Sequence, residues 1–339
     1  MTTKRWNMND IKKNPDDIRE AAAMLQSGQT VAFPTETVYG LGADATNQQA
    51  VSNIFKAKGR PEDNPLIAHV ATKEQLQRLV TSIPAYVDKL IDVFSPGPLT
   101  FILPSNGTCA SNVTAGLDTI GVRIPNHPIA LQLLKEVDIP IAAPSANISG
   151  KPSPTTADHV FDDLKGRIAG LVDGGPTGVG LESTVIDCTQ AIPVILRPGG
   201  VTKENLENVV GHVMVDPGII DGEGKPKSPG MKYKHYAPEV PLWVFEGDSN
   251  GFQALIVKEQ QHNHRVGVLC SNQVADQLSH DNIYPLGDSM EEIASSLYDG
   301  LRHFKQQAVD IILCESFPEN GIGQAIMNRL RKASDSTIK

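Results

Sequence analysis

Several cations stand where the chain leaves a predicted helix. Lys56, Lys58 and Arg60 occur within five residues, and Gly59 and Pro61 interrupt the helical pattern there. Cations in a last helical turn complement the helix dipole, so a purely structural role explains the pattern. The alternative is a phosphate or carboxylate clamp, in which Arg60 binds as a planar two-pronged donor and Lys58 as a mobile point charge.

Two further arginines accompany apolar strands. Arg123 interrupts the apolar run 119–125, and Arg197 follows the run 192–196. An unpaired buried charge is costly, so an arginine in a half-buried strand needs an anionic partner. No acid lies beside Arg123 in the sequence, which favours the carboxylate or phosphate of a ligand.

A cluster of hydroxyl groups follows the apolar run 31–33. Pro34 cannot donate to a strand ladder, so it ends this strand or places it at an edge. The hydroxyl residues are Thr35, Thr37 and Tyr39, and the glycines Gly40 and Gly42 follow them. Glycines permit a tight turn or a close approach to a ligand, so this stretch is either an ordinary strand-to-turn junction or a binding loop.

The stretch 140–150 repeats this design, with a short apolar strand before a loop that carries Ser145 and Asn147. Taken alone these side chains are turn and capping residues, and His69 in the strand 66–70 is a core histidine. Together, about 190 residues place hydroxyls, amides and cations at strand ends, as an α/β sheet does when it builds one ligand crevice.

Composition narrows the class of ligand. The 339 residues carry 39 acidic and 30 basic side chains, a net charge of −9, which disfavours broad contact with a nucleic-acid backbone and favours a small phosphorylated ligand. Four isolated cysteines exclude zinc ribbons and dithiol motifs. The N-terminus has no apolar signal region and no run approaches about 20 apolar residues. We therefore expect a soluble, cytoplasmic protein.

The elements that position these groups follow from hydrophobic spacing. In the first 208 residues we predict helices at 16–27, 48–58, 74–93 and from 156, and strands at 31–33, 66–70, 99–103, 119–125 and 192–196. From 240 we predict strands at 241–245, 266–270, 283–286 and 309–314 and helices at 251–260, 272–278, 289–304 and 322–333. This alternation indicates a smaller, parallel, Rossmann-like domain.

The segment between the two parts has linker composition. It is rich in Gly, Pro and Lys and ends in the cationic aromatic cluster KYKHYAP at 232–238. Such a cluster is unusual for a spacer, and we predict that it covers a pocket as a lid. The predicted organisation is a catalytic domain at 14–208, a linker and lid at 209–239, and a C-terminal domain at 240–336.

Taken together, these motifs resemble the YrdC-like family. The resemblance rests on PTETVYGL at 34–41, KGR at 58–60, NPL at 64–66, PGPLT at 96–100, SAN at 145–147 and SG at 149–150. It covers roughly 16–208, and the linker with the trailing domain resembles the longer, two-domain branch. The implied fold is an α/β fold with a twisted mixed sheet flanked by helices. The implied activity is threonylcarbamoyl-AMP synthesis from L-threonine, bicarbonate or CO₂, and ATP with Mg²⁺, for tRNA modification.

The resemblance also implies roles for individual residues. Around threonine it places Thr37, His69, Arg123 and Ser183. Around ATP it places Arg60, Asn64, Thr119, Ala143, Ser145, Ser153, Arg197 and Tyr236. Lys58 and Arg60 are the implied catalytic cations, and no metal ligand from the protein is implied. The implied partners are downstream proteins that transfer the threonylcarbamoyl group to tRNA, with no membrane and with direct tRNA binding left open.

Two other classes compete with this interpretation. A carbamoyltransferase that makes carbamoyl-adenylate for hydrogenase maturation shares the YrdC-like portion but carries Cys-rich zinc modules, against which the four isolated cysteines argue. A non-catalytic RNA-binding module is the second alternative. The net charge of −9 and the lack of interleaved stacking aromatics count against it.

Overall fold

The computed structural model describes residues 2–8, 15–218, 235–305 and 307–339. The chain divides into two compact units, and each is described by itself. Unit 1 comprises Met1–Ser149, Pro154–Gly178 and Glu182–Lys232, and unit 2 comprises Gly150–Ser153, Val179–Leu181 and Tyr233–Lys339. The predicted boundaries at 208 and 240 stay predictions, because 219–234 of the predicted linker and lid lie outside the described residues.

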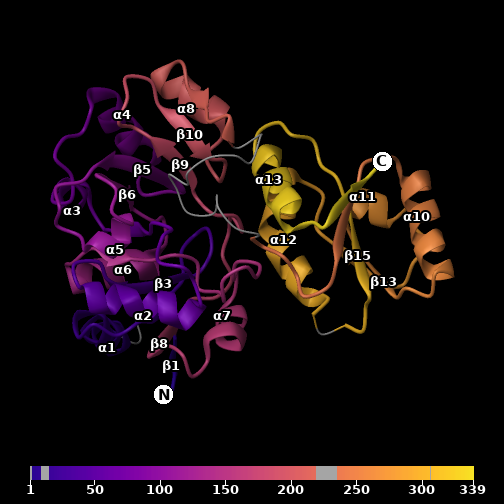
Figure 1. The fold of residues 1–339 in the computed structure, drawn as a ribbon, viewed down its shortest axis with the longest axis horizontal. Coiled ribbons are helices and arrows are strands. Elements are labelled where there is room, and N and C mark those ends of the chain that lie inside the picture. The colour runs from indigo at the N-terminus through magenta and orange to yellow at the C-terminus, as the bar shows by residue number, and fades with distance from the viewer. Residues whose placement is uncertain (1, 9–14, 219–234, 306) are drawn as a thin grey trace. The chain divides into compact units, whose positions relative to one another are not determined.

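Unit 1 is built on a mixed sheet with strand order β1-β8-β2-β3-β7-β4-β6-β5-β9-β10-β11. Several of these strands are labelled in Figure 1. The strands are β1 (Lys4–Asn7), β2 (Val31–Phe33), β3 (Gly40–Asp44), β4 (Ile67–His69), β5 (Leu99–Pro104), β6 (Thr119–Arg123), β7 (Ile141–Ala142), β8 (Gly170–Asp173), β9 (Thr184–Asp187), β10 (Val194–Arg197) and β11 (Met214–Val215). Parallel and antiparallel pairs occur together; β4 is parallel to β6, for example, whereas β5 is antiparallel to β6. The predicted mixed α/β fold is confirmed.

Helices cover both faces of this sheet. They are α1 (Pro15–Gln26), α2 (Gln48–Lys58), α3 (Lys73–Gln77), α4 (Ala85–Phe94), α5 (Ser111–Thr114), α6 (Pro128–Val137), α7 (Ala157–Leu164) and α8 (Lys203–Val210). Alternate residues of β2 belong to different cores, since Ala32 packs with α2 and α4 whereas Val31 and Phe33 pack with α1 and α6. Side chains of successive strand residues point to opposite faces, so the sheet lies between two helical layers.

Local sequence signals explain why α2 has the predicted bounds. The Asn47 side chain accepts hydrogen bonds from two backbone amides of the first turn, and Gly59 ends the helix in the left-handed conformation at φ 64°. Both are standard terminal residues for a helix. Val51, Ile54 and Phe55 are buried, as their spacing predicts.

Two predicted features of unit 1 are wrong in detail. The predicted helix 74–93 is two helices, α3 and α4. Proline disfavours a helical backbone in the residue before it, so the helix cannot continue through Pro84, and α4 begins directly after this proline. Gly40 and Gly42 lie within strand β3 rather than in a turn. A Cβ on Gly42 would lie 2.8 Å from Ile141 and 2.9 Å from Phe33, so this glycine permits close packing between strands.

Unit 2 has a parallel sheet with strand order β14-β13-β15-β12-β16. Its strands are β12 (Leu242–Phe245), β13 (Val266–Cys270), β14 (Ile283–Pro285), β15 (Ile311–Glu315) and β16 (Ser336–Ile338), and its helices are α10 (Ser249–Gln261), α11 (Asn272–Ala275), α12 (Met290–His303) and α13 (Gly323–Ala333). The predicted parallel Rossmann-like domain is confirmed, and β16 is an additional strand.

None of the described helices combines the length and apolar character needed to cross a membrane, and the compartment stays a prediction.

Candidate active site

Strand register brings the candidate threonine-binding residues to one edge of the unit 1 sheet. His69 ends β4 and lies opposite Arg123, which ends the parallel strand β6. The antiparallel strand β5 begins at the same edge, because Phe101 pairs with Val122 and Thr100 is therefore the next residue beside Arg123. Strand β9 runs parallel to β5, and Ser183 immediately precedes it. The ends of β4 and β6 and the beginnings of β5 and β9 thus lie at the same edge of the sheet and bring these side chains together.

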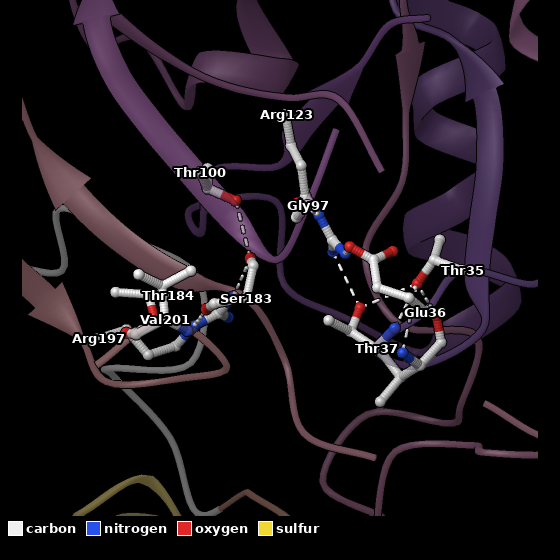
Figure 2. A network of polar contacts seen from close by, with 11 residues as sticks. Thr35, Glu36, Thr37, Gly97, Thr100, Arg123, Ser183, Thr184, Arg197 and Val201 are labelled. Carbon is white, nitrogen blue, oxygen red and sulfur yellow. Dashed lines mark hydrogen bonds and ion pairs between the residues drawn. The ribbon is translucent and has the colours of Figure 1, made fainter. Parts of the chain in front are cut away.

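Arg123 is the centre of the first polar group, shown in Figure 2. Only 4% of Arg123 is exposed. Its Nη1 donates to Thr37 Oγ1 at 2.9 Å, its Nε to the Gly97 carbonyl at 3.3 Å, and its Nη2 lies 2.7 Å from Glu36 Oε1. The sequence argument missed this acid because it considered only neighbours of Arg123 in the sequence. The connection between β2 and β3 supplies Glu36 from far along the chain.

Thr35 holds that connection in shape. Its Oγ1 lies 2.9 Å from Thr37 Oγ1, donates to the Val38 carbonyl at 2.7 Å and accepts from the Thr37 and Val38 amides. A threonine that bonds its own backbone two or three residues on forms a turn of defined geometry. The Thr37 hydroxyl is therefore presented to Arg123 by a fixed backbone.

Ser183 and Arg197 form a second group, joined to β5 through Thr100 (Figure 2). Ser183 Oγ lies 2.7 Å from Thr100 Oγ1. Arg197, also buried, donates to the Ser183 carbonyl from Nε at 3.1 Å and from Nη2 at 2.9 Å. Gly199 makes this approach possible, since a Cβ there would lie 2.3 Å from the carbonyl oxygen of Glu182.

His69 is neutral at physiological pH. Burial, with the positive charge of Arg123 as the second cause, lowers the pKa of His69 to about 3. Its Nδ1 lies 3.2 Å from the Ile67 carbonyl, which can only accept, so the neutral ring carries its proton there. Nε2 is left as an acceptor beside a buried arginine, an arrangement suited to a hydroxyl or an ammonium donor.

Lys58 is not a mobile charge. It is 2% exposed, and its Nζ donates to the carbonyls of Ser145 and Asn147 at 2.5 Å each. The Ser145 hydroxyl in turn lies 2.5 Å from Asn147 Oδ1. The prediction of a freely moving cation is therefore wrong, because carbonyl oxygens of the loop after β7 hold the ammonium. The structure brings Lys58 and Ser145 together, and their proposed ligand roles stay predictions.

The other candidate nucleotide-binding residues of unit 1 are less closely grouped. Arg60 Nη2 lies 3.4 Å from the carbonyl of Asn64, a buried residue. The Ala143 amide donates to the Ile67 carbonyl at 2.9 Å, so its carbonyl is the backbone group left for a ligand. Thr119 begins β6 whereas Arg123 ends it, which separates the two by roughly 13 Å of strand. No described contact joins Thr119 to the other candidates.

Ser153 and Tyr236 belong to unit 2 and are described with it. Ser153 is buried. Tyr236 has a left-handed backbone with φ 65°, which is uncommon for a residue with a bulky side chain. Its ring stacks on Tyr298 with centroids 5.4 Å apart, and the Arg329 guanidinium lies 5.4 Å from the ring centroid. The ring is thus packed between a tyrosine and an arginine, and the ligand role of Tyr236 stays a prediction.

The unit 1 sheet edge thus holds buried cations, hydroxyls, a neutral histidine and one carboxylate. Sequence reasoning assigned no ligand role to Thr35, Glu36 and Thr100 of this group, nor to Asn147 beside Lys58. All four lie inside the quoted motifs, so their signal was present but their side chains were not assigned. No group of three or more His, Cys, Asp or Glu side chains in the described part of the chain is arranged to hold a metal ion.

This fold and site define an α/β protein with buried cations beside a mixed sheet, an arrangement that a site for an anionic ligand requires. Residues 23–199 match the family model described as "Telomere recombination", and residues 201–335 match that described as "Threonylcarbamoyl-AMP synthase, C-terminal domain". The chain belongs to the threonylcarbamoyl-AMP synthase family, and the predicted family and enzyme class are confirmed.

Relatives of known name match over the full length. A threonylcarbamoyl-AMP synthase of Bacillus subtilis is 52% identical over 100% of this chain and 99% of its own. One of Pyrococcus abyssi is 49% identical over 95% of each chain. The crystal structure of P. abyssi Sua5 complexed with L-threonine superposes with a TM-score of 0.91 at 46% identity, covering 100% of this chain and 99% of that one.

Proposed function

We propose that this chain condenses L-threonine, bicarbonate or CO₂, and ATP into threonylcarbamoyl-adenylate and diphosphate. The observation that carries the proposal is the full-length match to relatives named threonylcarbamoyl-AMP synthase, at 52% identity for the B. subtilis protein. The described residues support it, because the group around Arg123 suits an amino acid and the cations Lys58, Arg60 and Arg197 suit a polyanion.

The amino-acid side of the proposed site is the group around Arg123. The guanidinium would bind the α-carboxylate, with the hydroxyls of Thr37 and Ser183 as further partners. The neutral His69 would accept a hydrogen bond from the substrate at Nε2. A site that hydrogen-bonds a substrate hydroxyl discriminates strongly against analogues lacking it, which suits threonine.

The phosphate side would use Lys58, Arg60 and Arg197. Two arginines can bind phosphate oxygens in two-pronged fashion, whereas the Lys58 ammonium, fixed by carbonyls, supplies a positioned charge. Mg²⁺ would accompany ATP and supply charge neutralisation on the phosphates. Because the described residues form no cluster of acids, most of its ligands would come from phosphate oxygens and water.

The proposed chemistry requires positioning rather than an enzyme nucleophile. The deprotonated amine of threonine reacts with bicarbonate to give a carbamate and water. A carbamate oxygen then attacks the α-phosphorus of ATP, and diphosphate leaves. Fixed cations stabilise the charge that develops on the phosphates, and bound substrates react as if at high local concentration.

The product would pass to proteins that transfer the threonylcarbamoyl group to an adenosine of tRNA. A mixed anhydride such as this adenylate is an activated acyl donor, so an acceptor must follow it. The net charge of −9 gives no support for extensive tRNA contact by this chain.

The proposal is tested with purified full-length protein, L-threonine, bicarbonate and ATP. Mass spectrometry should detect the adenylate, and diphosphate release should require both threonine and bicarbonate. Equal diphosphate production without threonine would contradict the proposal. A parallel arm with carbamoyl phosphate in place of threonine tests the carbamoyltransferase alternative, and a tRNA gel shift without nucleotide tests the RNA-binding alternative.

A further inference from the structure

Three polar atoms meet without hydrogen bonds where Glu36 lies beside Arg123. Arg123 Nη2 and Glu36 Oε1 are 2.7 Å apart, close enough to pair their charges. Among the described residues, however, neither of these atoms has a hydrogen-bond partner of proper geometry, and neither does Glu36 Oε2. The other donors of Arg123 are engaged, Nη1 by Thr37 and Nε by Gly97.

A simple counter-ion would be arranged differently. Arginine and carboxylate pairs favour parallel hydrogen bonds because the two groups match in shape. Buried polar atoms are nearly always hydrogen-bonded, so unsatisfied ones need an explanation. Here one donor and two acceptors without well-aligned hydrogen bonds lie side by side, and a partner that carries both an acceptor and a donor would complete them.

The Glu36 side chain is largely buried and starts from a hydrogen-bonded backbone. The Glu36 carbonyl accepts from the Gly178 amide at 3.2 Å, and the neighbouring Thr35 and Thr37 hydroxyls bond to each other. Only 12% of the Glu36 side chain is exposed. Figure 2 shows its carboxylate directed toward the Arg123 guanidinium. The carboxylate is therefore part of the site and not a solvated surface group.

We propose that Glu36 binds the α-ammonium of the substrate amino acid while Arg123 binds its α-carboxylate. This inference rests on the proposed function. A zwitterion supplies the missing acceptor for Arg123 Nη2 and the missing donors for Glu36 in one molecule. The two side chains together carry no net charge, which matches a zwitterion and not a simple anion. Before carbamate formation the ammonium loses one proton to solvent, and the N–H of the resulting carbamate still donates to Glu36.

The neighbouring titratable groups leave Glu36 as the acid of this subsite. Arg123 on β6 carries the positive charge, and the buried His69 on β4 is neutral. Burial also lowers the pKa of His127, against an opposing effect of Glu36. With both histidines disfavoured as cations, a cationic group of the substrate is the natural second partner of Glu36.

The experiment compares two ligands by titration calorimetry on the full-length protein without ATP. One is L-threonine, and the other is its 2-hydroxy analogue, in which a hydroxyl replaces the ammonium. Wild type should bind L-threonine at least about tenfold more tightly, since a charge-assisted hydrogen bond is typically worth that factor. Equal affinity for both ligands would overturn the inference without requiring any variant to fold.

Substitution then locates the effect at Glu36. Glu36→Gln should weaken the binding of L-threonine at least about tenfold and leave the affinity for the hydroxy acid unchanged or higher. Glu36→Asp keeps the charge and should retain part of the preference for L-threonine. The matched control is Glu136→Gln, an exposed acid on α6. Equal weakening of both ligands in Glu36→Gln would reduce Glu36 to a positioning residue for Arg123 and overturn the inference. If wild type binds no L-threonine, the proposed function itself fails.

Discussion

His69 lies directly opposite Arg123 in the ladder between the parallel strands β4 and β6. A guanidinium and an imidazole are thereby held side by side at the end of two buried strands. Only the arginine is charged, because burial and the charge of Arg123 lower the pKa of His69 to about 3. Burial, reinforced by the register that places Arg123 opposite, thus keeps a candidate substrate-binding residue neutral by lowering its pKa.

This relationship predicts an acid-dependent loss of stability. The ordinary pKa of histidine is 6.5, so between pH 6.5 and about 3 the unfolded chain binds a proton at His69 that the folded chain excludes. The free energy of unfolding should therefore fall as the pH falls through this window, by up to about 1.4 kcal/mol per pH unit from this residue. His69→Gln should reduce that slope. Urea unfolding of both proteins at pH 7 and 5.5 measures it, and identical slopes would show that His69 does not contribute.

Arg60 offers a test of cation shape. Arg60→Lys keeps the charge but loses the planar guanidinium, so turnover should fall about tenfold or more if Arg60 holds phosphate oxygens at two points. The melting temperature should change little, because Arg60 is half-buried, its hydrogen bonds to the carbonyls of Asn64 and Pro65 are long, at 3.4 and 3.3 Å, and lysine keeps the charge. Lys56→Arg, an exposed cation of the same helix end, is the control. Normal turnover with a large loss of melting temperature would instead assign Arg60 a structural role.

Gly199 packs closely against the backbone around Ser183, whose carbonyl accepts from Arg197. In Gly199→Ala the new Cβ would lie 2.3 Å from the Glu182 carbonyl oxygen and 2.4 Å from the Thr184 amide nitrogen. The backbone must move, and we expect a destabilisation of about 1–3 kcal/mol with a raised KM for ATP. Gly178→Ala is the control, since a Cβ there meets nothing within 4 Å. Thermal unfolding and steady-state kinetics measure both effects, and an unchanged KM would separate Arg197 from ATP binding.

The Tyr236 ring can be tested through its neighbour in unit 2. Tyr298→Leu removes the ring that stacks on Tyr236 while keeping an apolar side chain, so it should raise the KM for ATP in the same direction as Tyr236→Ala. Tyr298→Phe keeps the stacking and should retain activity. Circular dichroism checks that both variants fold. Full activity of Tyr236→Ala with unchanged ATP affinity would remove Tyr236 from the candidate nucleotide site.

The sequence by itself determined the features that depend on nearby residues. The bounds of α2 follow from Asn47 and Gly59, which lie at its two ends, and the parallel C-terminal domain follows from the alternation of strand and helix patterns. The split between α3 and α4 was also readable at Pro84, but the helical spacing on both sides concealed it. The family was recognisable because its motifs are short, ordered and contiguous.

Only the tertiary structure decided which of these residues meet. Arg123 obtains its acid from the β2–β3 connection, and the Lys58 ammonium is bound by carbonyls of the loop after β7. Sheet order and register create both contacts, and no local pattern specifies the order in which distant strands pair. Burial then changes the chemistry, making His69 neutral and leaving Glu36 with unsatisfied oxygens. These properties arise from long-range packing, because desolvation depends on everything that surrounds a side chain and not on its neighbours in the sequence.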